Sequence, residues 1–239
     1  MRKLFYCAAI GAALFSTSVL AQSYDEGAKA YNKRDFNTAM KNWKPLAEQG
    51  DVKAQYNVGL LYAQGLGADQ SYKEAVKFWT MAANKSSPEA SLALGRTYSQ
   101  GREGVEKNPA EAAKWFRKAG EAGNAEAQAE LAGLYERGEG VAKSDKDAVD
   151  WTKKAVAQGY TPAMASMGTR YETGKGVPQD KTKAYTYFTL AVAKATGKEA
   201  ETATASRNRI AADLKPDQVK AARDAASKCM AANYKNCAL

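Results

Sequence analysis

The 239-residue sequence contains no histidine. Histidine is the commonest general base in enzymes, the usual partner of a serine or cysteine nucleophile, and the commonest metal ligand. Two motifs of serine enzymes are also missing, because no serine has a lysine three residues later and no Gly-x-Ser-x-Gly occurs. We therefore predict a protein that is not an enzyme, with no catalytic residues, no metal ion and no cofactor.

Cysteine is scarce, with three residues at positions 7, 229 and 237. An oxidising compartment would favour a disulfide between Cys229 and Cys237. In a continuous helix their Cα atoms would lie about 12 Å apart, and a disulfide accepts about 4.4–6.8 Å. If the disulfide forms, the helix must end between them, near Asn233, and the tail must fold back. The alternative is two free thiols in a frayed terminus.

Long apolar runs are missing except near the start, where Leu4 to Phe15 follows Arg2 and Lys3. This pattern, with small or apolar residues leading to Ala21, is typical of a secretory signal peptide, residues 1–21. The run is too short for a membrane span, which needs about 20 apolar residues. We expect a soluble, exported protein without a membrane span, located in the periplasm, with secretion beyond the cell left open.

A repeat of about 36 residues dominates the remaining sequence. Four tyrosines recur 36, 37 and 36 residues apart within similar segments that end in glycine: Tyr62, Tyr98, Tyr135 and Tyr171. Four alanines recur at a similar spacing, 37, 36 and 36 residues apart, and each has an aromatic residue three positions later and another alanine four positions after that: Ala75, Ala112, Ala148 and Ala184. Steps of three and four residues mark one face of a helix, so each repeat is predicted to be two amphipathic helices.

The predicted helix ends are also repeated. Glycine pairs or near pairs stand between the two helices of each repeat, at Gly65 and Gly67, Gly101 and Gly104, Gly138 and Gly140, and Gly174 and Gly176. Glycine ends helices because it readily adopts left-handed backbone angles. Helix starts are predicted where a capping residue precedes proline, at Ser87, Asn108 and Thr161.

These patterns predict an all-α fold, an α/α solenoid of antiparallel helix pairs. Residues 22–50 form a degenerate first pair, residues 51–195 four repeats, and residues 196–239 a helical cap with the candidate disulfide. The formal charge of +9, or +7 without Arg2 and Lys3, is spread over the repeats. Because the lysines do not form a basic arm, we expect no nucleic-acid partner.

The repeated alanine, Leu-Gly-x-x-Tyr, x-x-Gly, x-Gly-Val and aromatic Lys-Ala elements resemble the SEL-one-like repeat family, a relative of tetratricopeptide repeats, over about residues 27 to 195. The resemblance implies a scaffold or adaptor that binds a protein or peptide on the concave face, which the first helix of each pair should line. Transferring tetratricopeptide positions to this chain gives the predicted groove residues Lys53, Tyr56, Gln64, Glu89, Arg96, Gln100, Glu126, Glu136, Arg137 and Glu172.

Two other functions remain open for this sequence. One is a cell-wall enzyme or β-lactam-binding protein that acts through carboxylates or a serine outside known motifs. The other is a secreted factor that binds a host glycoprotein. The lack of catalytic residues favours the non-catalytic binding scaffold in the bacterial envelope, and we expect a monomer.

Overall fold

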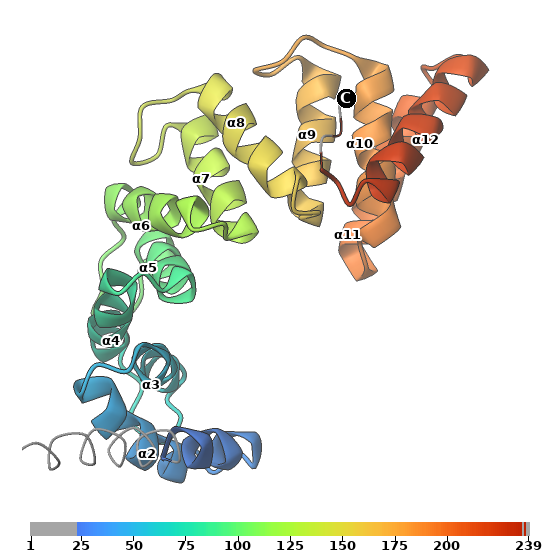
Figure 1. Cartoon of the computed structure of the whole chain (residues 1–239). Helices are drawn as coiled ribbons and strands as arrows, with labels where there is room; N and C mark the ends of the chain where they lie inside the picture. The colour runs from blue at the N-terminus through green and yellow to red at the C-terminus, as the bar shows by residue number, and fades with distance from the viewer. Residues whose placement is uncertain (1–22, 236, 238–239) are drawn as a thin grey trace, which may run out of the picture. The chain divides into compact units, whose positions relative to one another are not determined.

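The computed structural model describes residues 23–235 and residue 237 (Figure 1), and the regular secondary structure of these residues is helical. The predicted all-α fold is therefore confirmed. The predicted signal peptide, residues 1–21, lies outside the described residues. The chain divides into two compact units, Met1–Lys107 and Asn108–Leu239, and each is described by itself.

The first unit begins with a helix that is described over residues 23–32. The helices that follow are α2 (Phe36–Glu48), α3 (Val52–Gln64), α4 (Tyr72–Asn84) and α5 (Pro88–Gln100). Each of these packs against the next one along the chain, α2 on α3, α3 on α4 and α4 on α5. Consecutive packing of this kind is the arrangement expected of an α/α repeat.

The second unit continues the same pattern. Its helices are α6 (Pro109–Glu121), α7 (Ala125–Arg137), α8 (Asp145–Val156), α9 (Thr161–Thr173), α10 (Lys181–Lys194), α11 (Gly197–Ala211) and α12 (Pro216–Ala231). Consecutive helices from α6 to α11 pack together, and α10 also packs against α12. The last helix of the repeat region thus carries the C-terminal helices, α11 and α12.

Most helix starts are closed by a side chain, as the sequence predicts. The side chains of Ser87 and Asn108 accept hydrogen bonds from the backbone N–H of Ala90 and Glu111. The prediction for Thr161 was wrong, because α9 begins at Thr161, its cap position is Tyr160, and no side chain caps it. Pro162 falls within the first turn of α9, where its missing N–H leaves no helical hydrogen bond unmade.

In three of the four loops, the second glycine (Gly67, Gly140 and Gly176) allows the loop to touch the backbone of an earlier helix. A Cβ atom at Gly67 would collide with the backbone oxygen of Phe36, and one at Gly140 with that of Pro109, in each case 31 positions earlier. Gly104 is the second glycine of the loop that contains one inserted residue. A Cβ atom built on Gly104 would have no contact within 4 Å. The inserted residue therefore accompanies the loss of this contact between neighbouring repeats.

The predicted disulfide between Cys229 and Cys237 is present, with Cα atoms 5.0 Å apart. α12 ends at Ala231, and the chain then reverses through Asn233 and Tyr234, which have left-handed φ values of 50° and 62°. The Tyr234 ring lies 5.0 Å from the ammonium group of Lys194 on α10. The tail thus folds back onto the last helix pair, in the way that the cysteine spacing requires.

The loop contact can be tested with Gly67→Ala and its matched control Gly104→Ala. Both glycines have left-handed φ values, 72° and 74°, so both alanines carry a backbone penalty of about 1 kcal/mol. Only Gly67→Ala also meets backbone, so it should lower the free energy of unfolding by about 1–3 kcal/mol more. Urea unfolding followed by circular dichroism measures both, and equal losses would show that the loop contact contributes nothing.

Candidate binding surface

The first helix of each pair, here called the A-helix, carries the predicted groove residues. The A-helices are residues 23–32, α3 and α5 in the first unit, and α7 and α9 in the second unit. Six predicted groove residues belong to the first unit: Lys53, Tyr56, Gln64, Glu89, Arg96 and Gln100. The other four belong to the second unit: Glu126, Glu136, Arg137 and Glu172. The two sets have different surroundings.

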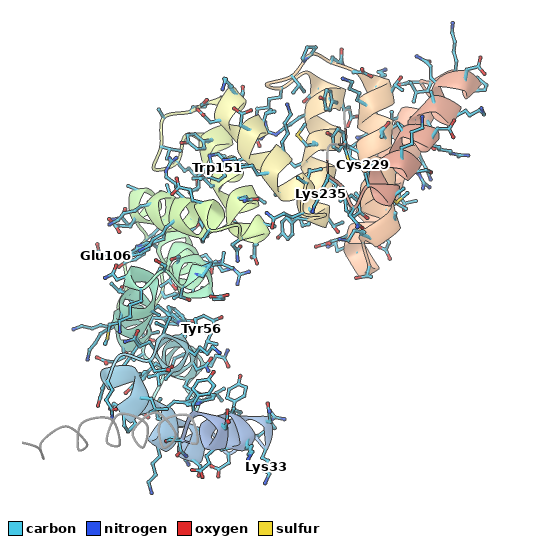
Figure 2. The ribbon with its side chains drawn as sticks, in the orientation of Figure 1. Lys33, Tyr56, Glu106, Trp151, Cys229 and Lys235 are labelled. Carbon is cyan, nitrogen blue, oxygen red and sulfur yellow. A yellow bond between two sulfur atoms is a disulfide. The ribbon has the colours of Figure 1, made fainter. Side chains whose placement is uncertain are left out.

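In the first unit, a cavity of about 260 Å³ collects residues from neighbouring repeats. It is lined by three predicted groove residues: Lys53 of α3, Glu89 of α5, and Tyr56 of α3, which is labelled in Figure 2. Lys85 also lines it, and its ammonium group donates a hydrogen bond to the Gly50 carbonyl oxygen at 2.7 Å. We call this hollow the polar cavity, because its lining includes two lysines, a glutamate and two tyrosines.

Tyr56 is the half-buried centre of the polar cavity. Burial raises the pKa of its phenol, and the nearby negative charge of Glu89 adds to this effect, while the positive charge of Arg96 opposes it. The phenol therefore stays protonated at neutral pH and can donate a hydrogen bond. Lys53, Tyr56 and Glu89 thus share one cavity, and Arg96, which does not line it, is close enough to Tyr56 for its charge to act on the phenol.

The remaining two predicted groove residues of the first unit lie elsewhere. Gln64 and Gln100 are exposed at the last positions of α3 and α5, and neither lines the polar cavity. Gln100 accepts a hydrogen bond from the Arg102 guanidinium group. The structure therefore groups residues near the starts of α3 and α5 and leaves out those at the helix ends.

A second cavity, of about 190 Å³, was not predicted from the sequence. We call it the aromatic cavity, because Tyr24, Tyr31 and Trp43 line it together with Ala28, Asn32, Asn57 and Leu60. It shares Tyr24 and Asn57 with the polar cavity, and the Asn57 amide donates a hydrogen bond to the Tyr24 hydroxyl at 3.0 Å. The spacing of Tyr24, Ala28 and Tyr31, which places them on one helix face, is the signal that could have revealed it.

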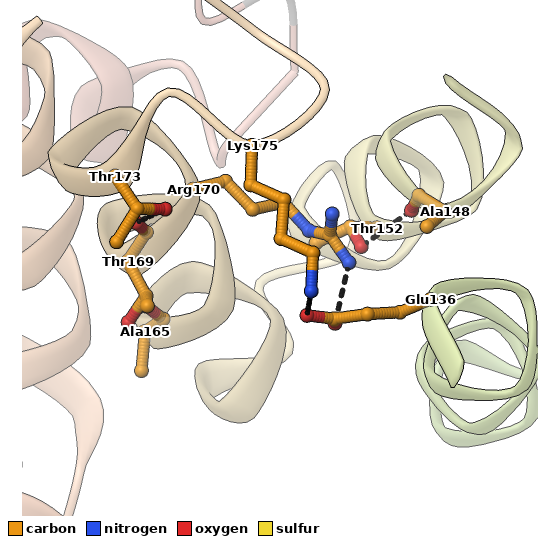
Figure 3. A network of polar contacts seen from close by, with 8 residues as sticks. All are labelled: Glu136, Ala148, Thr152, Ala165, Thr169, Arg170, Thr173 and Lys175. Atoms are coloured by element: carbon orange, nitrogen blue, oxygen red, sulfur yellow. Dashed lines mark hydrogen bonds and ion pairs between the residues drawn. The ribbon is translucent and has the colours of Figure 1, made fainter. Parts of the chain in front are cut away.

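In the second unit, the predicted groove residue Glu136 holds two helices together (Figure 3). One of its carboxylate oxygens lies 2.8 Å from the Arg170 guanidinium of α9, and the other lies 2.6 Å from the Lys175 ammonium. Burial on its own would raise the pKa of Glu136, but the hydrogen bond from Lys175 and the charge of Arg170 outweigh it and hold the pKa below its usual value. Glu136 therefore remains ionised and paired.

Arg170 makes this ion pair unusual, because its side chain is only 3% exposed and two of its nitrogen groups, Nε and Nη1, have no hydrogen-bond partner. Leucine occupies the equivalent position in two other repeats, at Leu61 and Leu134. A buried guanidinium needs a carboxylate to offset its loss of hydration. Glu136 supplies that carboxylate, so its role in this unit is structural.

The other predicted groove residues of the second unit also have partners. Glu172 pairs with Arg209 of α11 at 2.8 Å, and Arg137 pairs with Glu139 in the following loop at 3.0 Å. Glu126 is half-buried in the first turn of α7. Glu136 and Glu172 thus form two successive carboxylate–guanidinium links between A-helix α7, A-helix α9 and α11.

A third cavity, of about 480 Å³, lies between α9, α10 and α11 and contains no predicted groove residue. Most of its lining side chains are small or uncharged, such as those of Pro162 and Ala165. The hydroxyl groups of Thr169 and Thr202 donate to carbonyl oxygens of their own helices, so they are satisfied internally. Pro162 and Ala165 occupy the repeat positions of Lys53 and Tyr56, which explains why the charged pattern of the first unit is lost here.

No group of three or more cysteine, aspartate or glutamate side chains in residues 23–235 is arranged to hold a metal ion. Across the same part of the chain, no helix combines the length and apolar character that a membrane crossing needs.

Comparison with known structures supports the repeat. A Sel1 repeat protein from Oxalobacter formigenes is 28% identical, with a TM-score of 0.69 over 83% of this chain and 88% of that chain. The protective antigen c5321, present in uropathogenic Escherichia coli strains, displays an SLR fold and is 24% identical, with a TM-score of 0.54 over 87% of this chain and 52% of that chain. The second likeness shows the fold alone. No curated protein matches the chain.

A family model described as the Sel1 repeat matches five consecutive segments, residues 19–51, 52–87, 88–124, 125–160 and 161–195. The first match covers residues that the sequence indicated as a degenerate pair. The matches span well over half of the 239 residues and confirm the resemblance drawn from the repeated tyrosines, alanines and glycines. The chain belongs to the Sel1 repeat family.

Proposed function

We propose that the protein is a non-catalytic scaffold of the bacterial envelope that binds a segment of another protein on the A-helix face of residues 23–107. Sel1 repeat proteins are generally protein-interaction scaffolds, which supports the general role. The observation that carries the specific proposal is the polar cavity, where Lys53 and Tyr56 of one repeat meet Glu89 of the next. A cavity with both charge signs and a neutral phenol can bind polar side chains of a peptide and discriminate between them.

The second unit has a different part in this proposal. Its predicted groove residues Glu136 and Glu172 are occupied by ion pairs with Arg170 and Arg209. A partner that took these carboxylates would leave the guanidinium groups without their charge partners, which opposes binding there. We therefore place the polar contacts of the partner on the first unit.

Two features support a location in the envelope. The signal-peptide pattern of residues 1–21 favours export, and the disulfide between Cys229 and Cys237 is compatible with an oxidising compartment. Envelope proteins meet folded and unfolded partners outside the cytosol, where a disulfide persists.

The binding role predicts that Tyr56→Ala combined with Arg96→Ala weakens capture of the partner. Purified wild-type and variant chains are incubated with envelope extract. The complexes are then crosslinked, and the captured proteins are identified by mass spectrometry. The variant should lose the specific partner by about thirtyfold or more, because truncating two central interface side chains typically removes 1–2 kcal/mol or more each. The matched control is Lys73→Ala with Lys77→Ala, two exposed positions on α4. Equal capture by all three chains would reject the A-helix face as the binding surface.

The location predicts the oxidation state of the cysteines in cells. Osmotic-shock fluid should contain the protein with Cys229 and Cys237 unreactive toward a thiol reagent until a reductant is added, because both sulfurs are in the disulfide. Reactive thiols are counted by mass spectrometry after alkylation under denaturing conditions. Recovery in the cytosol with two reactive thiols at these positions would contradict export.

The structural role of Glu136 predicts a loss of stability in Glu136→Gln, because Arg170 loses its carboxylate. We expect about 2 kcal/mol at neutral pH, less than for a fully buried pair since Glu136 is one-third exposed. A lowered pKa stabilises the folded state above the unfolded pKa, and this is lost as pH falls through the folded pKa. The difference between wild type and variant should therefore shrink on acidification.

The matched control for Glu136→Gln is Glu139→Gln, whose partner Arg137 is half-exposed. Urea unfolding at several pH values measures all three chains. The surface pair should change the free energy of unfolding by less than about 1 kcal/mol. If both variants change the free energy of unfolding equally, Glu136 does not stabilise the buried Arg170, and Glu136 is again a candidate groove residue.

A further inference from the structure

The aromatic cavity is shaped by three residues on one face of the first helix. Tyr24, Ala28 and Tyr31 lie four and three positions apart, so the two phenol rings flank a position that carries only a methyl group. Both rings lie against Trp43, at centroid distances of 5.8 and 5.7 Å and interplanar angles of 32° and 34°. The small side chain of Ala28 thus leaves a hollow between two tyrosines that pack on one tryptophan.

The floor of the aromatic cavity is fixed in place. The Trp43 indole N–H donates to the Tyr24 backbone oxygen at 3.0 Å, and Trp43 is only 3% exposed. A Cβ atom at Gly27 would lie 2.5 Å from the indole nitrogen, so glycine is needed for this close packing. The aromatic surfaces are therefore held by the fold and do not need a ligand to order them.

The opposite wall supplies hydrogen-bonding groups. Asn57 of α3 uses one N–H on the Tyr24 hydroxyl oxygen, at 3.0 Å, and its amide carries a second N–H and a carbonyl oxygen. The Tyr24 hydroxyl accepts this bond, so its own hydrogen is available to another acceptor. Burial raises the pKa of Tyr24, which keeps that hydrogen in place at neutral pH. The cavity thus combines aromatic faces with at least two donors.

This chemistry matches one kind of peptide. A polyproline II segment has no internal hydrogen bonds, so its carbonyl oxygens need donors from the protein, and its rings are apolar and compact. Aromatic-lined grooves with nearby donors bind such segments with a small loss of conformational entropy. No charged side chain lines the aromatic cavity, so a cationic group would find no carboxylate there.

We propose that the aromatic cavity binds a proline ring of an extended, proline-containing peptide segment, whose carbonyl oxygens accept hydrogen bonds from Asn57 and Tyr24. This rests on the proposed function, since the same segment would reach the polar cavity, which shares both residues. The proline ring enters between Tyr24 and Tyr31, over Ala28. A polar residue next to the proline then faces Lys53 and Glu89.

The test uses the full chain and two fluorescein-labelled peptides of twelve residues, one with Pro-x-x-Pro repeats and one with alanine at every proline. Fluorescence anisotropy measures binding. The proline peptide should bind at least about fivefold more tightly, because the alanine peptide is not preorganised and lacks the ring. Equal affinity, or no binding of the proline peptide, overturns the proposal.

Variants locate the binding site. Tyr31→Ala should weaken binding of the proline peptide by about tenfold, since an aromatic anchor in a pocket typically contributes this much. Tyr72→Ala removes a tyrosine of α4 that lines neither cavity, and should leave binding unchanged. Ala28→Leu keeps every aromatic ring but fills the hollow, so it should weaken binding even if Tyr31→Ala disturbs folding. Circular dichroism checks the fold of each variant.

A trimethyllysine peptide tests the class of ligand, and the envelope-capture experiment separates this inference from the proposed function. If a trimethyllysine peptide binds in place of the proline peptide and is lost in Tyr31→Ala, the cavity recognises a cation and the proline assignment is wrong. If no proline peptide binds but capture of the envelope partner still depends on Tyr56 and Arg96, the proposed function stands and only the ligand class is rejected. Loss of both rejects both.

Discussion

Close approach of neighbouring helices over alanine is the constraint on which the repeat depends. One alanine in the second helix of each repeat has no exposed surface, at Ala82, Ala119, Ala155 and Ala191. Any larger side chain there would push the helices apart, because protein interiors are close-packed. One turn earlier, an aromatic residue is buried against the neighbouring helix: Phe78, Trp115, Trp151 and Tyr187. Small and large residues therefore alternate along one helix face, and this sets the spacing of the array.

This constraint explains which parts of the structure could be predicted from the sequence. Helix pairs, glycine stops and the caps at Ser87 and Asn108 follow from local patterns, so the sequence alone identified them. The disulfide was predictable because an exported protein with two remaining cysteines favours pairing them, and helix geometry then required the helix to end between Cys229 and Cys237. The predicted cap at Thr161 was wrong because α9 starts one residue earlier than predicted, which places Tyr160 at the cap position. No sequence pattern distinguishes these two starting points.

The binding surface was harder to predict, because exposure at a repeat position depends on what lies in the neighbouring repeat. Glu136 sits at a position taken as groove, but Arg170 replaces the leucine found at Leu134, and the buried guanidinium takes the carboxylate. The aromatic cavity needs three helices to be brought together, since Trp43 and Asn57 come from outside the helix that carries Tyr24. The sequence periodicity reveals the wall formed by the first helix, but it cannot show that Trp43 and Asn57 complete the cavity.

The repeat also lets the A-helix face vary while the backbone stays the same, because the buried alanines and aromatics lie on other helix faces. The positions of Lys53 and Tyr56 in the first unit become Pro162 and Ala165 on α9. Tyr24 and Asn57 line both cavities of the first unit, so they connect the two cavities. A ligand that fills only one small cavity gains little, whereas a segment that fills both meets the second at a high effective concentration. Selectivity would therefore come from the order in which the ligand presents its ring and its polar side chain.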